Sequence, residues 1–151
     1  MYGLIHSGVA PSPAYFASSG NSEPRPAPGR VRVLVVDDNP DTVISLLAVL
    51  RDEGYDAEGM ADARRTIAEV ETFRPDVLIV DIAMPNVSGW DIAREVRKLS
   101  GKKPMLIAIS GVYDKTADQL VSRAAGFSHF LRKPCEPNFL LNILAAVFPG
   151  K

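Results

Sequence analysis

Short apolar runs alternate along the chain with segments in which apolar residues recur every three or four positions. Runs rich in Val, Ile and Leu are typical of strands buried on both faces of a sheet, whereas the three-to-four spacing is typical of helices with one buried face. Five strands alternating with five helices imply a parallel sheet with helices on both faces, a doubly wound α/β fold. The expected strands are residues 31–36, 55–60, 77–80, 105–109 and 127–131, and the expected helices centre on residues 43–50, 63–70, 92–99, 120–124 and 139–147.

Residues 1–30 lack this pattern. They contain five prolines among glycine, serine and alanine, and few charges. Such a composition cannot bury enough apolar surface to offset the entropy lost on ordering. We therefore expect a flexible leader over residues 1–30 and one domain over residues 31–148. The methionine start suggests a stand-alone protein, although a proline-rich linker would also suit the terminal module of a hybrid kinase.

Charge and composition exclude several classes of protein. A net charge of −1 gives no basic surplus for direct nucleic-acid binding. The sequence contains neither an apolar run long enough to span a bilayer nor a secretory signal, so we expect no membrane insertion and a cytoplasmic location. Cys135 is the single cysteine, which excludes an internal disulfide and fits a reducing compartment.

Polar residues follow the expected strands at the point where each one ends. Asp37 and Asp38 follow the first strand, Asp81 the third, Ser110 the fourth, and Lys133 the fifth. In an open α/β sheet, the carboxyl ends of the strands form the edge at which ligands bind. We therefore expect three carboxylates, a hydroxyl and an ammonium to meet at one edge.

This set of groups suits phosphoryl transfer. Clustered carboxylates repel one another unless a cation intervenes, and oxygen ligands favour a hard ion such as Mg²⁺. A lysine can meet a phosphoryl oxygen, and a serine supplies a neutral donor. An aspartate is the available nucleophile, and carboxylates do form aspartyl-phosphates.

Four segments of the sequence, taken in their order and spacing, resemble the receiver domains of two-component response regulators. The type that they resemble is the single-domain receiver of chemotaxis regulators. The resemblance runs from about residue 31 to residue 147 and implies a flavodoxin-like sheet of strand order 2-1-3-4-5. The segments are residues 33–40 (VLVVDDNP), 80–85 (VDIAMP) with Gly89, 109–111 (ISG) and 131–134 (LRKP).

The resemblance assigns the central chemistry to three aspartates. It implies that Asp81 is the phosphoacceptor, phosphorylated from a phosphohistidine on a sensor histidine kinase or a histidine phosphotransfer protein. It also implies that Asp38, Asp81 and the backbone carbonyl of Ala83 ligate Mg²⁺, and that Asp37 reaches the ion through water.

Three further roles follow from the resemblance. Lys133 would pair with Asp81 and then with the phosphoryl group, and the Lys133–Pro134 peptide bond is often cis in the family. Ser110 would move to hydrogen-bond the phosphoryl group, and Phe130 would turn inward behind it.

Three positions depart from the commonest family pattern. Phe130 stands where tyrosine is frequent, so this aromatic switch has no hydroxyl for a partner. Ala83 and Val112 stand where relatives often carry polar side chains that influence attack by water. We therefore expect water to be poorly positioned for dephosphorylation.

The resulting hypothesis is a phosphoacceptor switch that catalyses its own phosphorylation and dephosphorylation but is not an enzyme in the usual sense. It would signal through protein contacts on the face built from the fourth helix, the fifth strand and the fifth helix. The sequence identifies neither the kinase nor the target, and it leaves open whether phosphorylation drives homodimer formation.

Two alternatives use the same kind of sheet. A phosphatase of the haloacid dehalogenase type would need a second aspartate two positions after Asp37, where this chain has Asn39, and a cap domain. A degenerate receiver would bind partners without being phosphorylated, although all the residues required for phosphorylation are present here.

Overall fold

The computed structural model describes residues 29–111 and 123–150. Apart from Gly29 and Arg30, the expected leader lies outside the described residues, as do Val112 and most of the expected fourth helix, of which residues 123–125 are seen to be helical.

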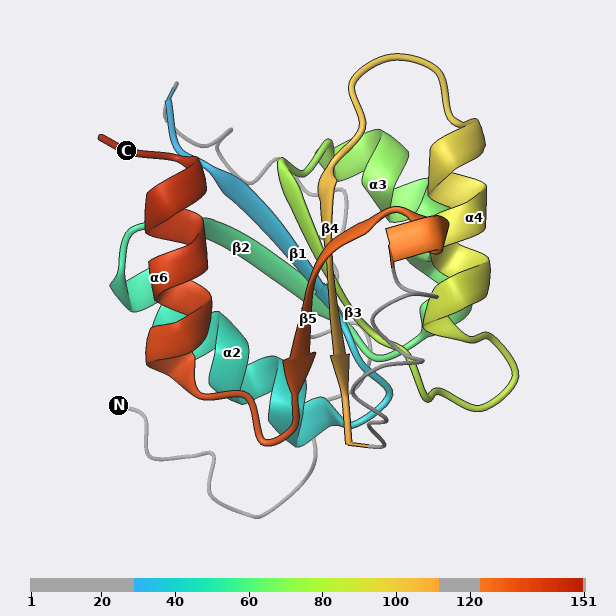
Figure 1. Cartoon of the computed structure of the whole chain (residues 1–151), viewed down its shortest axis with the longest axis horizontal. Helices are drawn as coiled ribbons and strands as arrows, with labels where there is room; N and C mark the ends of the chain where they lie inside the picture. The colour runs from blue at the N-terminus through green and yellow to red at the C-terminus, as the bar shows by residue number, and fades with distance from the viewer. Residues whose placement is uncertain (1–28, 112–122, 151) are drawn as a thin grey trace, which may run out of the picture.

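Five parallel strands form one sheet in the order β2-β1-β3-β4-β5, which confirms the predicted fold class and strand order (Figure 1). The second strand, expected over residues 55–60, is also confirmed, and it pairs in parallel with the first strand. The strands are β1 (Arg32–Val36), β2 (Asp56–Met60), β3 (Val77–Asp81), β4 (Met105–Ser110) and β5 (Phe127–Arg132).

Helices cover both faces of the sheet. In Figure 1, α2 and α6 lie on one side and α3 and α4 on the other. No helix in the described ranges is long and apolar enough to cross a membrane. The helices are α2 (Pro40–Asp52), α3 (Thr66–Phe73), which follows the short 3₁₀ turn η2 (Ala63–Arg65), α4 (Gly89–Lys98) and α6 (Pro137–Val147).

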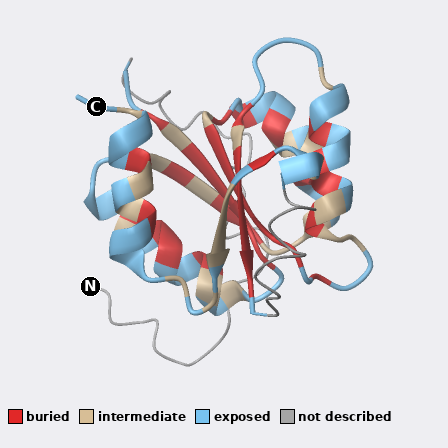
Figure 2. Cartoon of the chain, viewed as in Figure 1, coloured by how far each residue is buried: buried red, intermediate tan, exposed pale blue. Residues whose placement is uncertain are grey.

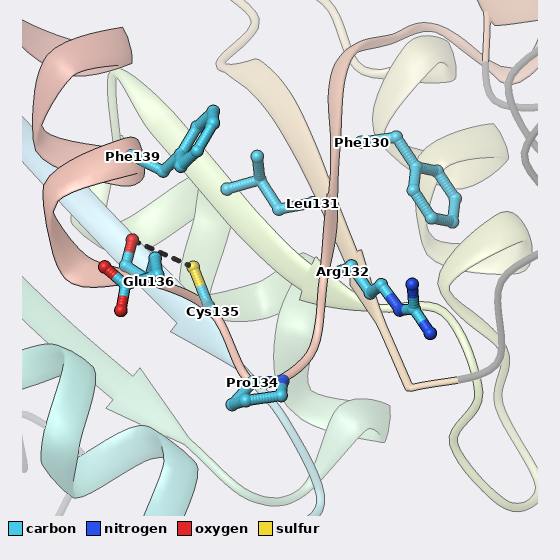
Figure 3. A pocket seen from close by; sticks show the side chains of 7 residues that line it. All are labelled: Phe130, Leu131, Arg132, Pro134, Cys135, Glu136 and Phe139. Carbon is cyan, nitrogen blue, oxygen red and sulfur yellow. Dashed lines mark hydrogen bonds between the residues drawn. The ribbon is translucent and has the colours of Figure 1, made fainter.

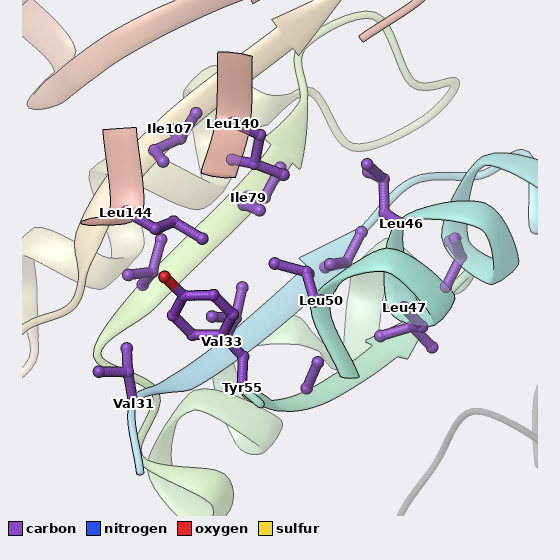
Figure 4. Packing of buried hydrophobic residues seen from close by; sticks show 14 of the residues in the cluster. Val31, Val33, Leu46, Leu47, Leu50, Tyr55, Ile79, Ile107, Leu140 and Leu144 are labelled. Carbon is purple, nitrogen blue, oxygen red and sulfur yellow. The ribbon is translucent and has the colours of Figure 1, made fainter. Parts of the chain in front are cut away.

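The core is divided into two layers by the sheet, and alternate residues of each strand enter opposite layers. The three central strands are almost wholly buried (Figure 2). On the side of α2 and α6, Val33 and Ile79 pack with Leu50, Leu140 and Leu144 (Figure 4). The side of α3 and α4 has its own cluster, whose fully buried members include Leu34, Val36, Leu78, Val80 and Ala108.

Local sequence starts two helices at the carboxyl edge of the sheet. Asn39 caps α2 by accepting a hydrogen bond from the Asp41 backbone N–H at 3.0 Å, and Pro40 stands at the first helical position. Ser88 caps α4 in a reciprocal capping box with Asp91. The helix α2 begins after a three-residue connection from β1, and α4 begins after a seven-residue connection from β3.

Candidate functional site

Three carboxylates meet at the carboxyl edge of the sheet, as the sequence predicts. One oxygen from each of Asp37, Asp38 and Asp81 lies within 4.8 Å of the others. Neighbouring parallel strands β1 and β3 end side by side, and this pairing brings the three aspartates together. Asp37 and Asp81 are buried, with 0% and 3% of their surfaces exposed, whereas Asp38 is open to solvent.

Lys133 reaches into this cluster from the end of β5. Its Nζ lies 3.1 Å from Asp81 Oδ2, to which it donates a hydrogen bond, and 2.7 Å from Asp37 Oδ2. The contact between Lys133 and Asp37 is an ion pair that lacks hydrogen-bond geometry. Asp37 Oδ2 is therefore buried without a hydrogen-bond partner. The Lys133–Pro134 peptide bond is cis, as the resemblance implied.

The charges of the cluster do not balance among the described residues. Burial raises the pKa of Asp37, and the neighbouring Asp81 charge adds to this, although Lys133 and the Asn39 backbone N–H oppose it. Burial alone would lower the pKa of Lys133, but its contacts with Asp37 and Asp81 outweigh burial and raise it. One ammonium among three carboxylates leaves a surplus of negative charge that a divalent cation can neutralise.

The connection from β3 to α4 is closed directly beside Asp81. The Gly89 backbone N–H donates to the Ile82 carbonyl at 3.1 Å, and the Ala83 backbone N–H donates to Asp81 Oδ1 at 3.0 Å. A Cβ on Gly89 would lie 2.8 Å from the Asp81 carbonyl oxygen, so a side chain there would force this loop apart. The close packing explains why glycine suits this position. Ala83 itself is exposed.

Ser110 and Phe130 lie on the other face of the sheet from the Asp81 side chain. Alternation along β4 and β5 places them with Ala108, on the side of α4, and Ser110 is 1% exposed. Phe130 is partly buried, and Figure 3 shows it on the opposite side of β5 from Leu131. The backbone joins Ser110 to the cluster, because its carbonyl accepts from the Lys133 N–H at 2.8 Å.

The contacts of Asn39 do not support the alternative that this chain is a phosphatase of the haloacid dehalogenase type. Its side chain accepts the first backbone N–H of α2, while its own N–H donates to Asp37 Oδ1 at 2.9 Å. A side chain that caps the helix in this way is not the acid or base that a haloacid dehalogenase would need.

Two features near the cluster were not predicted from sequence. A cavity of about 450 Å³ lies beside Lys133, where Asp41 and Ser45 of α2 face Cys135. Arg132 lies opposite Ser110 in the β4–β5 register. The four-residue spacing of Asp41 and Ser45 could have placed both on one face of the helix α2. Only the packing of α2 against the sheet shows that Lys133 and Cys135 line the same cavity.

Comparison with known proteins establishes the family. Residues 33–145 match the model of the response regulator receiver domain, so the chain belongs to this family of two-component signalling proteins. Receiver domains as a family are phosphoacceptor switches rather than turnover enzymes. Its solved relatives include a response regulator receiver protein from Pseudomonas putida (29% identity, TM-score 0.72, covering 80% of this chain and 99% of that one). Another is the chemotaxis protein CheY4 of Vibrio cholerae (28% identity, TM-score 0.70, covering 79% and 99%).

Among curated proteins, the chain is 31% identical over 112 residues to the DNA-binding response regulator MtrA of Mycolicibacterium smegmatis. That match covers 74% of this chain but 48% of the relative, so the chain spans about half the length of the DNA-binding relatives that it resembles. A 14.6 kDa protein of Leptolyngbya boryana is 33% identical over 113 residues, which make up 86% of its length.

Proposed function

We propose that this chain accepts a phosphoryl group from a phosphohistidine onto Asp81, in a Mg²⁺-dependent reaction, and signals through protein–protein contacts. The observation that carries the proposal is the joining of Asp81 to two further carboxylates and to Lys133 in one cluster. Family membership supports a sensor histidine kinase or a histidine phosphotransfer protein as the donor. We place this reaction in the cytoplasm.

The residues present fit a magnesium ion. Carboxylate oxygens are the ligands this ion prefers, and the buried Asp37 Oδ2 has no hydrogen-bond partner in the described structure. Asp38, Asp81 and the backbone carbonyl of Ala83 would hold the ion, and Asp37 would contact it through water. The bound ion would neutralise charge on the transferring phosphoryl oxygens.

The chain's own residues then have distinct parts in the transfer. An Asp81 carboxylate oxygen attacks phosphorus, the bond to the donor's histidine nitrogen breaks, and that nitrogen keeps the electron pair. Lys133, already beside Asp81, pairs with the phosphoryl oxygens. The Ser110 hydroxyl donates a hydrogen bond to the product, and Phe130 turns inward behind it.

Movement of Ser110 and Phe130 would change the surface around β5 and α6. Phe139 and Val147 of α6 expose 66% and 43% of their surfaces, so this side already presents apolar groups to a partner or to a second copy of the chain. The DNA-binding activity of MtrA belongs to a protein of twice the matched length, and we assign no such activity here.

The proposal is tested by incubating the purified chain with acetyl phosphate and Mg²⁺ and measuring its intact mass. We expect a gain of ~80 Da, the mass of one phosphoryl group, and its absence when EDTA removes the metal. A folded protein that binds Mg²⁺ but gains no mass would contradict the proposal and favour the degenerate receiver.

Replacing Ala83 by asparagine is expected to shorten the lifetime of the phosphorylated state. Ala83 is exposed beside Asp81, so an amide there has room to hydrogen-bond an attacking water. One such bond, at about 1 kcal/mol, corresponds to roughly a fivefold faster loss of the phosphoryl group. The decay of the adduct after removal of acetyl phosphate measures this rate, and Ala83→Ser is a smaller polar control. An unchanged lifetime in Ala83→Asn would show that water positioning does not limit dephosphorylation.

A further inference from the structure

Arg132 ends β5 directly opposite Ser110 of β4. Strands in a sheet lie about 4.8 Å apart, and residues in register on parallel strands point to the same face. The Arg132 side chain therefore begins next to that of Ser110, on the Phe130 side of the sheet. Figure 3 shows it extending from β5 on that side, away from Cys135 and Phe139.

The guanidinium of Arg132 is not committed to a structural contact within the described part of the chain. Arg132 is exposed, and no ion pair or side-chain hydrogen bond joins it to another described residue. Some arginines do make such contacts: Arg32 pairs with Asp56, and Arg97 donates to the Ala124 carbonyl at 2.8 Å. Arg132 thus places a cation without a partner among the described residues at the carboxyl edge, on the opposite face of the sheet from Lys133.

The charge of the phosphorylated site leaves a role for this cation. A phosphoryl group carries close to two negative charges at neutral pH, and Asp37 and Asp38 remain beside it. Mg²⁺ and Lys133 together neutralise three of these charges, which leaves about one in excess. An arginine is suited to this place, because its planar fork binds phosphoryl oxygens through two hydrogen bonds.

We propose that Arg132 is a phosphoryl-binding residue, which holds the transferring group on the Ser110 side of Asp81 and accelerates its transfer from anionic donors. The inference rests on the proposed function. It adds a second cationic side chain to the site, supplied by the residue before Lys133.

The test compares initial rates of adduct formation from acetyl phosphate at saturating Mg²⁺ in four proteins. These are wild type, Arg132→Ala, Arg132→Lys and the control Arg123→Ala, which removes an exposed positive charge near the other end of β5. We expect Arg132→Ala to be about tenfold slower, as for the loss of one charge-assisted hydrogen bond, and Arg132→Lys to recover part of the rate. The control should match wild type.

Two further measurements separate binding of the phosphoryl group from other effects. Mg²⁺ affinity, followed by the fluorescence of the single tryptophan Trp90, and thermal stability should be the same in Arg132→Ala and wild type. Equal rates for Arg132→Ala and wild type, or equal slowing in Arg132→Ala and Arg123→Ala, would overturn the inference while leaving the proposed function intact. A wild-type protein that forms no adduct would contradict the proposed function itself.

Discussion

Replacing Asp81 by asparagine is expected to abolish the phosphoryl adduct completely. The amide keeps the shape of the carboxylate, and its oxygen can still accept the Ala83 backbone N–H now bonded to Asp81 Oδ1. It cannot form a stable acyl phosphate, because an amide lacks the negatively charged oxygen that attacks phosphorus. Folding should therefore survive while phosphorylation disappears.

Intact mass after incubation with acetyl phosphate and Mg²⁺ measures this outcome. Asp52→Asn is the matched control, since it removes an exposed carboxylate at the far end of α2 and should leave the adduct unchanged. Persistence of the ~80 Da adduct in both Asp81→Asn and Asp81→Ala would mean that another carboxylate is the acceptor. Asp38, the exposed member of the cluster, would then be the next residue to replace.

Replacing Asp37 by asparagine is expected to stabilise the metal-free protein at neutral pH and to weaken its stabilisation by Mg²⁺. The Asp37 side chain is fully buried, and its Oδ2 has no hydrogen-bond partner. Burial of this charge raises its pKa, which means that folding opposes its ionisation. The amide removes that penalty, and Lys133 keeps its hydrogen bond to Asp81. We expect a gain of about 1 kcal/mol in the free energy of unfolding.

The pH dependence of this gain follows from the direction of the pKa shift. The pKa of Asp37 is higher in the folded state than in the unfolded state, so the unfolded chain releases its proton first as pH rises. Wild-type stability therefore falls between these two pKa values, and the penalty is complete above the folded one. The advantage of Asp37→Asn should be absent at pH values below the unfolded pKa.

Urea unfolding in EDTA and in excess Mg²⁺ checks both parts of the prediction. Wild type should gain about 2.7 kcal/mol at a Mg²⁺ concentration one hundred times its dissociation constant, and Asp37→Asn should gain less. Asp41→Asn is the control, because Asp41 is exposed in the first turn of α2, where its charge slightly favours the helix. If Asp37→Asn were no more stable than wild type in EDTA, burial of this charge would not be a net cost.

Much of the fold follows from sequence patterns that act locally. The run from Val77 to Val80 predicts a strand buried on both faces, and the structure extends it by one residue to Asp81. Asn39 and Pro40 predict the start of α2 because a cap and a fixed φ act within one turn of helix. The position of Asp81 at the carboxyl end of a strand could be predicted from the apolar run that precedes it and stops there.

Relations between segments depended on the tertiary structure. Asp81 and Lys133 are 52 positions apart, and their 3.1 Å contact exists because β3 and β5 flank β4. No local pattern predicts that Asp37 Oδ2 is buried without a hydrogen bond, since this depends on how tightly three separate segments meet. Resemblance to a family indicated which residues meet, but not how their charges and burial balance.

Strand register shows most clearly the difference between what local sequence determines and what tertiary structure determines. The sequence by itself determined five strands, their parallel direction and the polar residues at their ends, because propensity and periodicity are properties of contiguous residues. It did not determine that Arg132 lies opposite Ser110, since a register shift at Leu106 and Ile107 sets the pairing between β4 and β5. Only packing of the whole sheet decides such a shift, because every buried side chain must keep its face while the strands find their partners.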